Sequence, residues 1–156
     1  FYGKWGKRLD DAGLERTAVT VRTDADNPIS PDAAIRAKGV AGNKLAVDCC
    51  EALGAVTLCG PYHSALGSFS GAGPSKDEWK WGVETMREVA EHAAKTGVTL
   101  AVEAVNRFEC YMMNCMKDAA RTADAPVEAS ENATVEEPAD APADEHVEAE
   151  GDGSAE

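Results

Sequence analysis

The sequence contains no apolar run of the length that a membrane-spanning helix needs, and it shows no signal peptide. Its five cysteines are an odd number, have no Cys-x-x-Cys spacing and lie mostly in apolar runs, so no disulfide framework or zinc knuckle is visible. Free cysteines that behave as small apolar residues are typical of a reducing compartment. We therefore expect a cytoplasmic protein with no membrane partner.

Basic residues are absent from the last part of the chain. Residues 1–124 hold all 15 Lys and Arg and 17 of the 28 acids, a net charge of −2, whereas residues 125–156 hold the other 11 acids, a net charge of −11. Neither part has the basic stripe that nucleic acid requires, so we expect no nucleic-acid partner. Because residues 125–156 also lack aromatic residues and an apolar period, we predict one domain over 1–124 and a disordered acidic tail over 125–156.

The first 124 residues alternate between strand-like and helix-like segments. Runs of β-branched or apolar residues predict strands over residues 16–23, 56–59 and 98–102. Helical periodicity predicts helices over residues 2–12, 31–53, 76–96 and 115–122. The chain has no initiating Met and begins inside the first of these helices, so we expect an earlier part of the protein to be missing or processed away.

Capping residues mark the starts of three predicted helices. The run Ser30–Asp32 offers an N-cap, a proline at the first helical position and an acid in the first turn. Ser75 and Glu78 have the spacing of a capping box, and Asn114 is a candidate N-cap for the last helix. These signals predict where each helix begins.

Two of the predicted helices carry further patterns. Gly39 and Gly42 lie inside the helix predicted over 31–53, where each should cost about 1 kcal/mol relative to Ala. In the next helix, five residues fall on one expected core face: Trp79, Val83, Met86, Ala90 and Ala93.

The order of these elements predicts an α/β protein. The predicted strands end near residues 23, 61 and 103, roughly 40 residues apart, with a helix between each pair. This is the repeating βα unit of a parallel sheet, and both a (β/α)8 barrel and a doubly wound sheet fit it. No Gly-x-Gly-x-x-Gly follows any strand, so a dinucleotide-binding version has no direct support.

The strand predicted over 98–102 is followed directly by a carboxylate. Its run, Val-Thr-Leu-Ala-Val, suits a strand buried on both faces, and Glu103 comes next, with Asn-Arg-Phe-Glu at 106–109. Catalytic residues of α/β folds collect at the carboxyl ends of such strands. Glu103 is therefore the leading candidate for a functional residue.

Three segments of the sequence resemble the sugar isomerase/epimerase family, whose fold is the xylose isomerase-like TIM barrel. They are Gly-Pro-Tyr-His-Ser-Ala-Leu-Gly at 60–67, Asp-Glu-Trp-Lys-Trp-Gly-Val at 77–83, and Leu-Ala-Val-Glu at 100–103 together with residues 106–109. Within the family they are most similar to the D-tagatose 3-epimerases and the D-psicose (allulose) 3-epimerases. The resemblance runs from about residue 9 to about residue 121.

This resemblance implies a fold, a reaction and a set of site residues. Such enzymes are (β/α)8 barrels in which two glutamates, an aspartate and a histidine hold one Mn²⁺, Co²⁺ or Mg²⁺, and the two glutamates exchange the proton at C3 of a free ketose. By resemblance, Glu103 is a metal ligand and the first of the two catalytic glutamates. Glu109 matches a glutamate that binds the sugar, and His63 is a candidate for the wall of the sugar pocket.

The same comparison implies that the barrel is incomplete. A barrel needs about 200 residues or more, and the three predicted strands match the second to fourth strands of the family. The other metal ligands and the second catalytic glutamate belong to the unmatched half. We therefore expect an incomplete barrel of about three βα units that is a truncated, inactive copy of a ketose epimerase. The alternatives are a non-catalytic half-barrel that assembles with another chain, including a second copy of itself, or a non-functional fragment.

Each assigned residue also has a structural alternative. Glu103 can be a solvated residue at a strand end, and Glu109 can be paired with Arg107. His63 can be a turn residue that hydrogen-bonds to the backbone. An apurinic endonuclease on the same fold would need more histidine ligands and a basic face, and the sequence shows neither.

Overall fold

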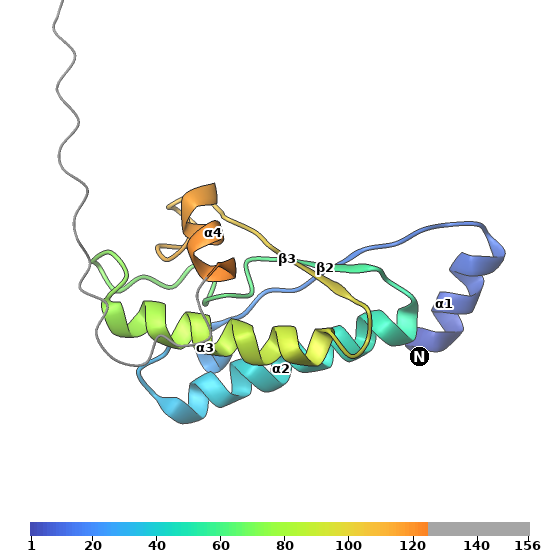
Figure 1. Cartoon of the computed structure of the whole chain (residues 1–156), viewed down its shortest axis with the longest axis horizontal. Coiled ribbons are helices and arrows are strands. Elements are labelled where there is room, and N and C mark those ends of the chain that lie inside the picture. Colours follow the sequence, from blue (N-terminus) through green and yellow to red (C-terminus); the bar gives the residue numbers. More distant parts are fainter. Residues whose placement is uncertain (125–156) are drawn as a thin grey trace, which may run out of the picture. The chain divides into compact units, whose positions relative to one another are not determined.

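The computed structural model describes residues 1–124, which form three parallel strands and four α-helices (Figure 1). The strands are β1 (Ala18–Val19), β2 (Thr57–Gly60) and β3 (Thr99–Val102), and their order in the sheet is β1-β2-β3. Both strand pairs are parallel. The prediction of successive βα units with a parallel sheet is confirmed, and the acidic tail predicted over 125–156 lies outside the described residues.

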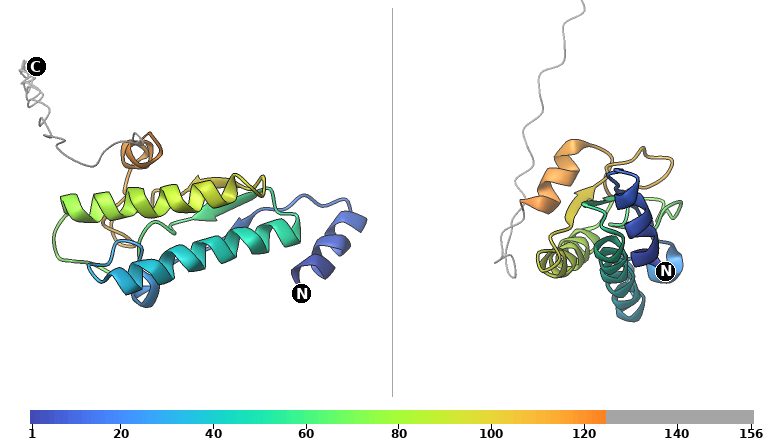
Figure 2. Two further views of the ribbon diagram at one scale, coloured as in Figure 1. Left: turned by 60° about the horizontal axis from the view of Figure 1, so that its bottom comes forward. Right: turned by 90° about the vertical axis from the view of Figure 1, so that its right-hand side faces the viewer.

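The helices follow the predicted order. They are α1 (Tyr2–Asp11), α2 (Ala33–Leu53), α3 (Lys76–Ala93) and α4 (Met116–Ala123), with a short 3-10 turn η1 (Asp24–Asp26) after β1. Helices α2 and α3 lie side by side against the strands (Figure 2). None of the helices within residues 1–124 is long and apolar enough to cross a membrane.

The main core lies between this helix pair and the sheet. It contains Leu58 of β2 and Val47 of α2 with Val89 of α3, each of which is almost fully buried. A second cluster, beside the N-terminal half of α3, contains Ile29, Trp79, Cys110, Met112 and Met113. The predicted core face of α3 is partly wrong, because Val89 is buried and Ala90 is exposed.

The observed caps correct two predicted helix starts. Helix α2 begins after Asp32, whose Oδ1 accepts from the Ala34 N–H at 2.7 Å, so the N-cap is Asp32 and not Ser30. Helix α4 is capped by Cys115 and not by Asn114. The Asn114 amide instead donates to two backbone carbonyls of the preceding loop, which explains the shift by one residue.

The capping box of α3 is confirmed. The Glu78 N–H donates to Ser75 Oγ at 3.1 Å, and the Ser75 N–H donates to Glu78 Oε2 at 2.7 Å. The Tyr111 hydroxyl also donates to Glu78 at 2.5 Å. Burial acts in the opposite direction, but these hydrogen bonds lower the pKa of Glu78.

The two glycines inside α2 occupy positions where a side chain would collide with the segment after β1. A Cβ at Gly39 would lie 2.6 Å from the Asp26 carbonyl oxygen, and one at Gly42 would lie 2.2 Å from Arg22 Nη1. Arg22 in turn forms an ion pair with Asp26 at 2.9 Å. Because neither glycine has a side chain, α2 can pack closely on this segment. The cost is a lower helix propensity at both positions.

Strand β1 is much shorter than the predicted 16–23. Only Ala18 and Val19 pair continuously with β2, opposite Leu58 and Cys59. Beyond them the chain contacts the next loop through an isolated parallel bridge between Arg22 and Ala65. Among the described residues β1 is an edge strand with a partner on one side only, so β-branched composition alone does not extend its ladder.

Candidate functional site

The loops that follow the three strands are joined to one another at the carboxyl end of the sheet. The Leu66 N–H donates to the Arg22 carbonyl at 2.9 Å, and the Gly67 N–H donates to the Glu109 carbonyl at 2.7 Å. Asn27 Oδ1 accepts from the Ala65 N–H at 3.1 Å. The loop after β2 therefore links the segment after β1 to the segment after β3.

Glu103 lies directly after β3 and has a fixed backbone. Its N–H donates to the Gly60 carbonyl at 3.2 Å, and its carbonyl accepts from His63 Nε2, also at 3.2 Å. The Glu103 residue is exposed, and no side chain within residues 1–124 pairs with its carboxylate. The backbone of Glu103 is thus hydrogen-bonded through both its N–H and its carbonyl, while its side chain remains accessible.

Glu109 belongs to a turn organised by Asn106. Asn106 Nδ2 donates to Glu109 Oε2 at 2.5 Å, and Asn106 Oδ1 accepts from the Phe108 N–H at 2.9 Å. Such a side-chain-capped turn is typical of Asn. Glu109 is exposed, and Phe108 is 85% exposed beside it. The Glu109 carboxylate pairs with Asn106 and not with Arg107, the partner offered by the structural alternative.

His63 lies in the loop after β2 and is fully buried. Its Nε2 faces the Glu103 carbonyl and its Nδ1 lies 3.0 Å from Ser64 Oγ. Burial lowers the pKa of His63 from 6.5 to about 4, so the imidazole is neutral near pH 7. These contacts agree with the structural alternative for His63, a turn residue that hydrogen-bonds to the backbone.

The structure therefore joins two of the three predicted residues directly. His63 contacts Glu103 through its backbone, and Glu109 is tied to the loop after β2 through Gly67. Sequence reasoning did not single out Asn106, whose position three residues before Glu109 is the local signal for a side-chain-capped turn.

The described residues do not by themselves form a divalent metal site. Within residues 1–124 no group of three or more His, Cys, Asp or Glu side chains is placed to hold a metal ion. Glu103 is one carboxylate, whereas hard divalent cations take several oxygen ligands. The donor set predicted by resemblance is therefore not assembled by this part of the chain.

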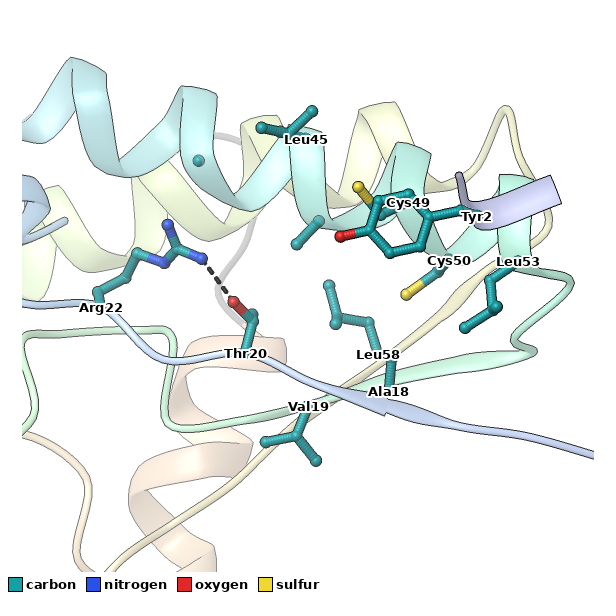
Figure 3. A pocket seen from close by; sticks show the side chains of 12 residues that line it. Tyr2, Ala18, Val19, Thr20, Arg22, Leu45, Cys49, Cys50, Leu53 and Leu58 are labelled. Carbon is teal, nitrogen blue, oxygen red and sulfur yellow. Dashed lines mark hydrogen bonds between the residues drawn. The ribbon is translucent and has the colours of Figure 1, made fainter. Parts of the chain in front are cut away.

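A pocket of about 350 Å³ lies away from these residues, between α1, α2 and the free edge of β1 (Figure 3). Its wall is mostly apolar, and Thr20 and Arg22 are hydrogen-bonded to each other at one end. None of Glu103, Glu109 and His63 lines it.

Parallel βα units with an exposed carboxylate after a strand fit a portion of an α/β barrel, open at both edges of its sheet among the described residues. A sequence profile described as "Xylose isomerase-like TIM barrel" matches residues 3–135. The chain belongs to this family.

Ketose 3-epimerases are among its relatives. The chain is 38% identical over 106 residues to an L-ribulose 3-epimerase of Methylomonas sp. (strain DH-1), an alignment that covers 68% of this chain and 37% of that protein. It is 30% identical over 109 residues to a D-psicose 3-epimerase of Agrobacterium fabrum, covering 69% of this chain and 38% of that enzyme. The predicted family is confirmed, and the chain spans well under half the length of these relatives.

Solved structures give the same result. A D-allulose 3-epimerase from Methylomonas sp. in complex with D-allulose superimposes with a TM-score of 0.72 at 31% identity, covering 76% of this chain and 41% of that one. A structure of an L-ribulose 3-epimerase gives a TM-score of 0.76 at 27% identity, covering 80% and 41%. The predicted incomplete barrel is thus confirmed as a fold.

Proposed function

We propose that this chain carries part of the active site of a ketose 3-epimerase, with Glu103 as a catalytic base and metal ligand and Glu109 as a sugar contact. The observation that carries the proposal is the exposed Glu103 carboxylate, whose backbone is fixed at the carboxyl end of β3. The similarity to L-ribulose and D-psicose 3-epimerases supports the substrate class, a free ketose.

C3 epimerisation needs a base such as a carboxylate, but one carboxylate is not sufficient for the whole reaction. A positioned carboxylate can remove the proton next to a ketose carbonyl, and Glu103 is accessible for this step. Inversion requires a second group on the opposite face of the sugar to return the proton. Because residues 1–124 contain no cluster that could hold a metal either, the described part supplies one base and no complete site.

We therefore expect no epimerisation by this chain alone. The test incubates the full chain with D-fructose, D-psicose or D-tagatose, with Mn²⁺ or Co²⁺ added, and separates the sugars by chromatography. Turnover by the chain alone would show that it is not an inactive portion of the enzyme.

A hybrid enzyme tests the assigned role of Glu103. Residues of this chain replace the matched segment of the Methylomonas L-ribulose 3-epimerase, and the unmodified relative serves as the positive control. The hybrid should epimerise its ketose, and Glu103→Gln should reduce kcat by at least about 100-fold. Glu109→Gln should chiefly raise KM, because its assigned contact is with bound sugar. Full activity of the Glu103→Gln hybrid would contradict the assignment.

The open faces of the sheet favour a second function, in which this chain is a half-barrel that assembles with another chain. Val19, Cys59 and Ala101 form a row across the sheet by register, and Val19 is 67% exposed. The apolar pocket lies along the free β1 edge, and such an edge is a template for strand pairing. Multi-angle light scattering tests the case in which the other chain is a second copy, because a stable monodisperse monomer would exclude self-assembly as the way the barrel is completed.

A further inference from the structure

A buried chain of hydrogen bonds connects the segment after β3 to Glu103. The Met112 N–H lies 3.2 Å from Cys110 Sγ, which lies 3.0 Å from Ser64 Oγ. Ser64 Oγ lies 3.0 Å from His63 Nδ1, and His63 Nε2 lies 3.2 Å from the Glu103 carbonyl oxygen. The three side chains in the middle are between 0% and 2% exposed.

When the His63 imidazole is neutral, the two ends of this chain fix the direction of every bond within it. A backbone N–H can only donate and a backbone carbonyl can only accept. His63 must therefore carry its proton on Nε2, which leaves Nδ1 as an acceptor. Ser64 must donate to Nδ1, so its oxygen accepts from the Cys110 thiol, and the sulfur accepts from Met112.

We propose that Ser64 and Cys110 are positioning residues that act through His63 to hold the backbone of Glu103. The thiol, the hydroxyl and the neutral imidazole each donate once and accept once, so no group in the chain is left unsatisfied. Removing one member leaves its neighbours buried without a partner, which destabilises the whole arrangement. The proposal rests on the proposed function for its purpose, because the group held in place is the one assigned as the base.

The first test is the imidazole tautomer of His63 in the metal-free chain of 156 residues. Long-range ¹H–¹⁵N spectra at neutral pH should show the Nε2–H form, with the signal assigned by its loss in His63→Gln. The Nδ1–H form would reverse the bonds and overturn the proposal. This measurement needs no ketose and no metal, so its failure is separate from a failure of the epimerase hybrid.

The second test compares two substitutions at Cys110 by amide hydrogen exchange. Cys110→Ala removes both a donor and an acceptor, and should speed exchange of the Glu103 amide by about tenfold or more relative to the Val89 amide in α3. Cys110→Ser keeps both functions and should leave this ratio within about threefold of that of the wild-type chain. Ser64→Ala should behave like Cys110→Ala.

Two outcomes of the exchange experiment would overturn the proposal. One is an equal increase at Glu103 and Val89 in Cys110→Ala, which would indicate general loss of stability. The other is an increase in Glu103 amide exchange in Cys110→Ser as large as that in Cys110→Ala. This would mean that packing of the thiol, and not its hydrogen bonds, holds the backbone at Glu103.

Discussion

Burial of His63 predicts a specific dependence of stability on pH. The imidazole is 0% exposed, and burial lowers its pKa from 6.5 to about 4. The unfolded chain therefore binds a proton between these values that the folded chain excludes. The contribution of neutral His63 to the free energy of unfolding is fully present above about pH 6.5. It is lost as the pH falls toward about 4, and the total loss is about 3 kcal/mol.

The size of the effect can be measured above the range in which carboxylates titrate. Linkage with these two pKa values gives a loss of about 2 kcal/mol in the free energy of unfolding between about pH 8 and about pH 5. Asp26 adds its own loss only at lower pH, because the pKa of its carboxyl lies below the ordinary 3.8. Urea denaturation followed by tryptophan fluorescence gives the free energy of unfolding at each pH.

The substitution His63→Gln isolates this contribution. The variant should be less stable at about pH 8, and the difference from the wild-type chain should shrink by about 2 kcal/mol by about pH 5. His92→Gln removes another histidine and should leave the His63 component intact. Parallel stability curves for the wild-type chain and His63→Gln would refute the reasoning, because they would mean that the buried imidazole takes up its proton in the folded state.

Two further predictions concern the helices that support the site, and each has its own control substitution. Gly39→Ala should lower the free energy of unfolding by more than about 1 kcal/mol despite the higher helix propensity of Ala, because the new Cβ would lie 2.6 Å from the Asp26 carbonyl oxygen. Gly3→Ala, whose Cβ has its nearest contact at 3.7 Å, is the matched control and should be neutral or stabilising in the same urea titration. Ser75→Ala should cost about 1 kcal/mol by removing the acceptor of the Glu78 N–H, whereas Ser75→Asp should retain most of the stability; equal losses in both would argue against the cap.

Local signals predicted the architecture because each one depends on a few neighbouring residues. The capping box at Ser75 and Glu78 comes from short-range backbone chemistry. Alternation of strands and helices then required a parallel sheet. The length of β1 could not be predicted in this way, because it depends on which backbone groups find partners across the sheet.

The contacts of His63 could not be predicted from the sequence either, because they also depend on partners that are distant along the chain. Ser64 and Cys110 are 46 residues apart, and they meet only because β2 and β3 pair in register and bring their following loops together. Cys110 is 1% exposed, which agrees with the expectation that the cysteines behave as small apolar residues. Its hydrogen bond to Ser64 is a tertiary property that no local pattern encodes.

The contacts that fix the backbone of Glu103 among the described residues come from the end of β2 and the loop after it. Gly60 and His63 hold its backbone on the β2 side, and the hydrogen-bond chain through Ser64 and Cys110 supports His63 from the segment after β3. Among the described residues, the backbone of this acid is therefore held by one strand pair and its two loops. Under the proposed function, this part of the barrel keeps the geometry of one glutamate but lacks the reaction, and a hybrid that supplies the remaining strands should therefore recover activity through Glu103.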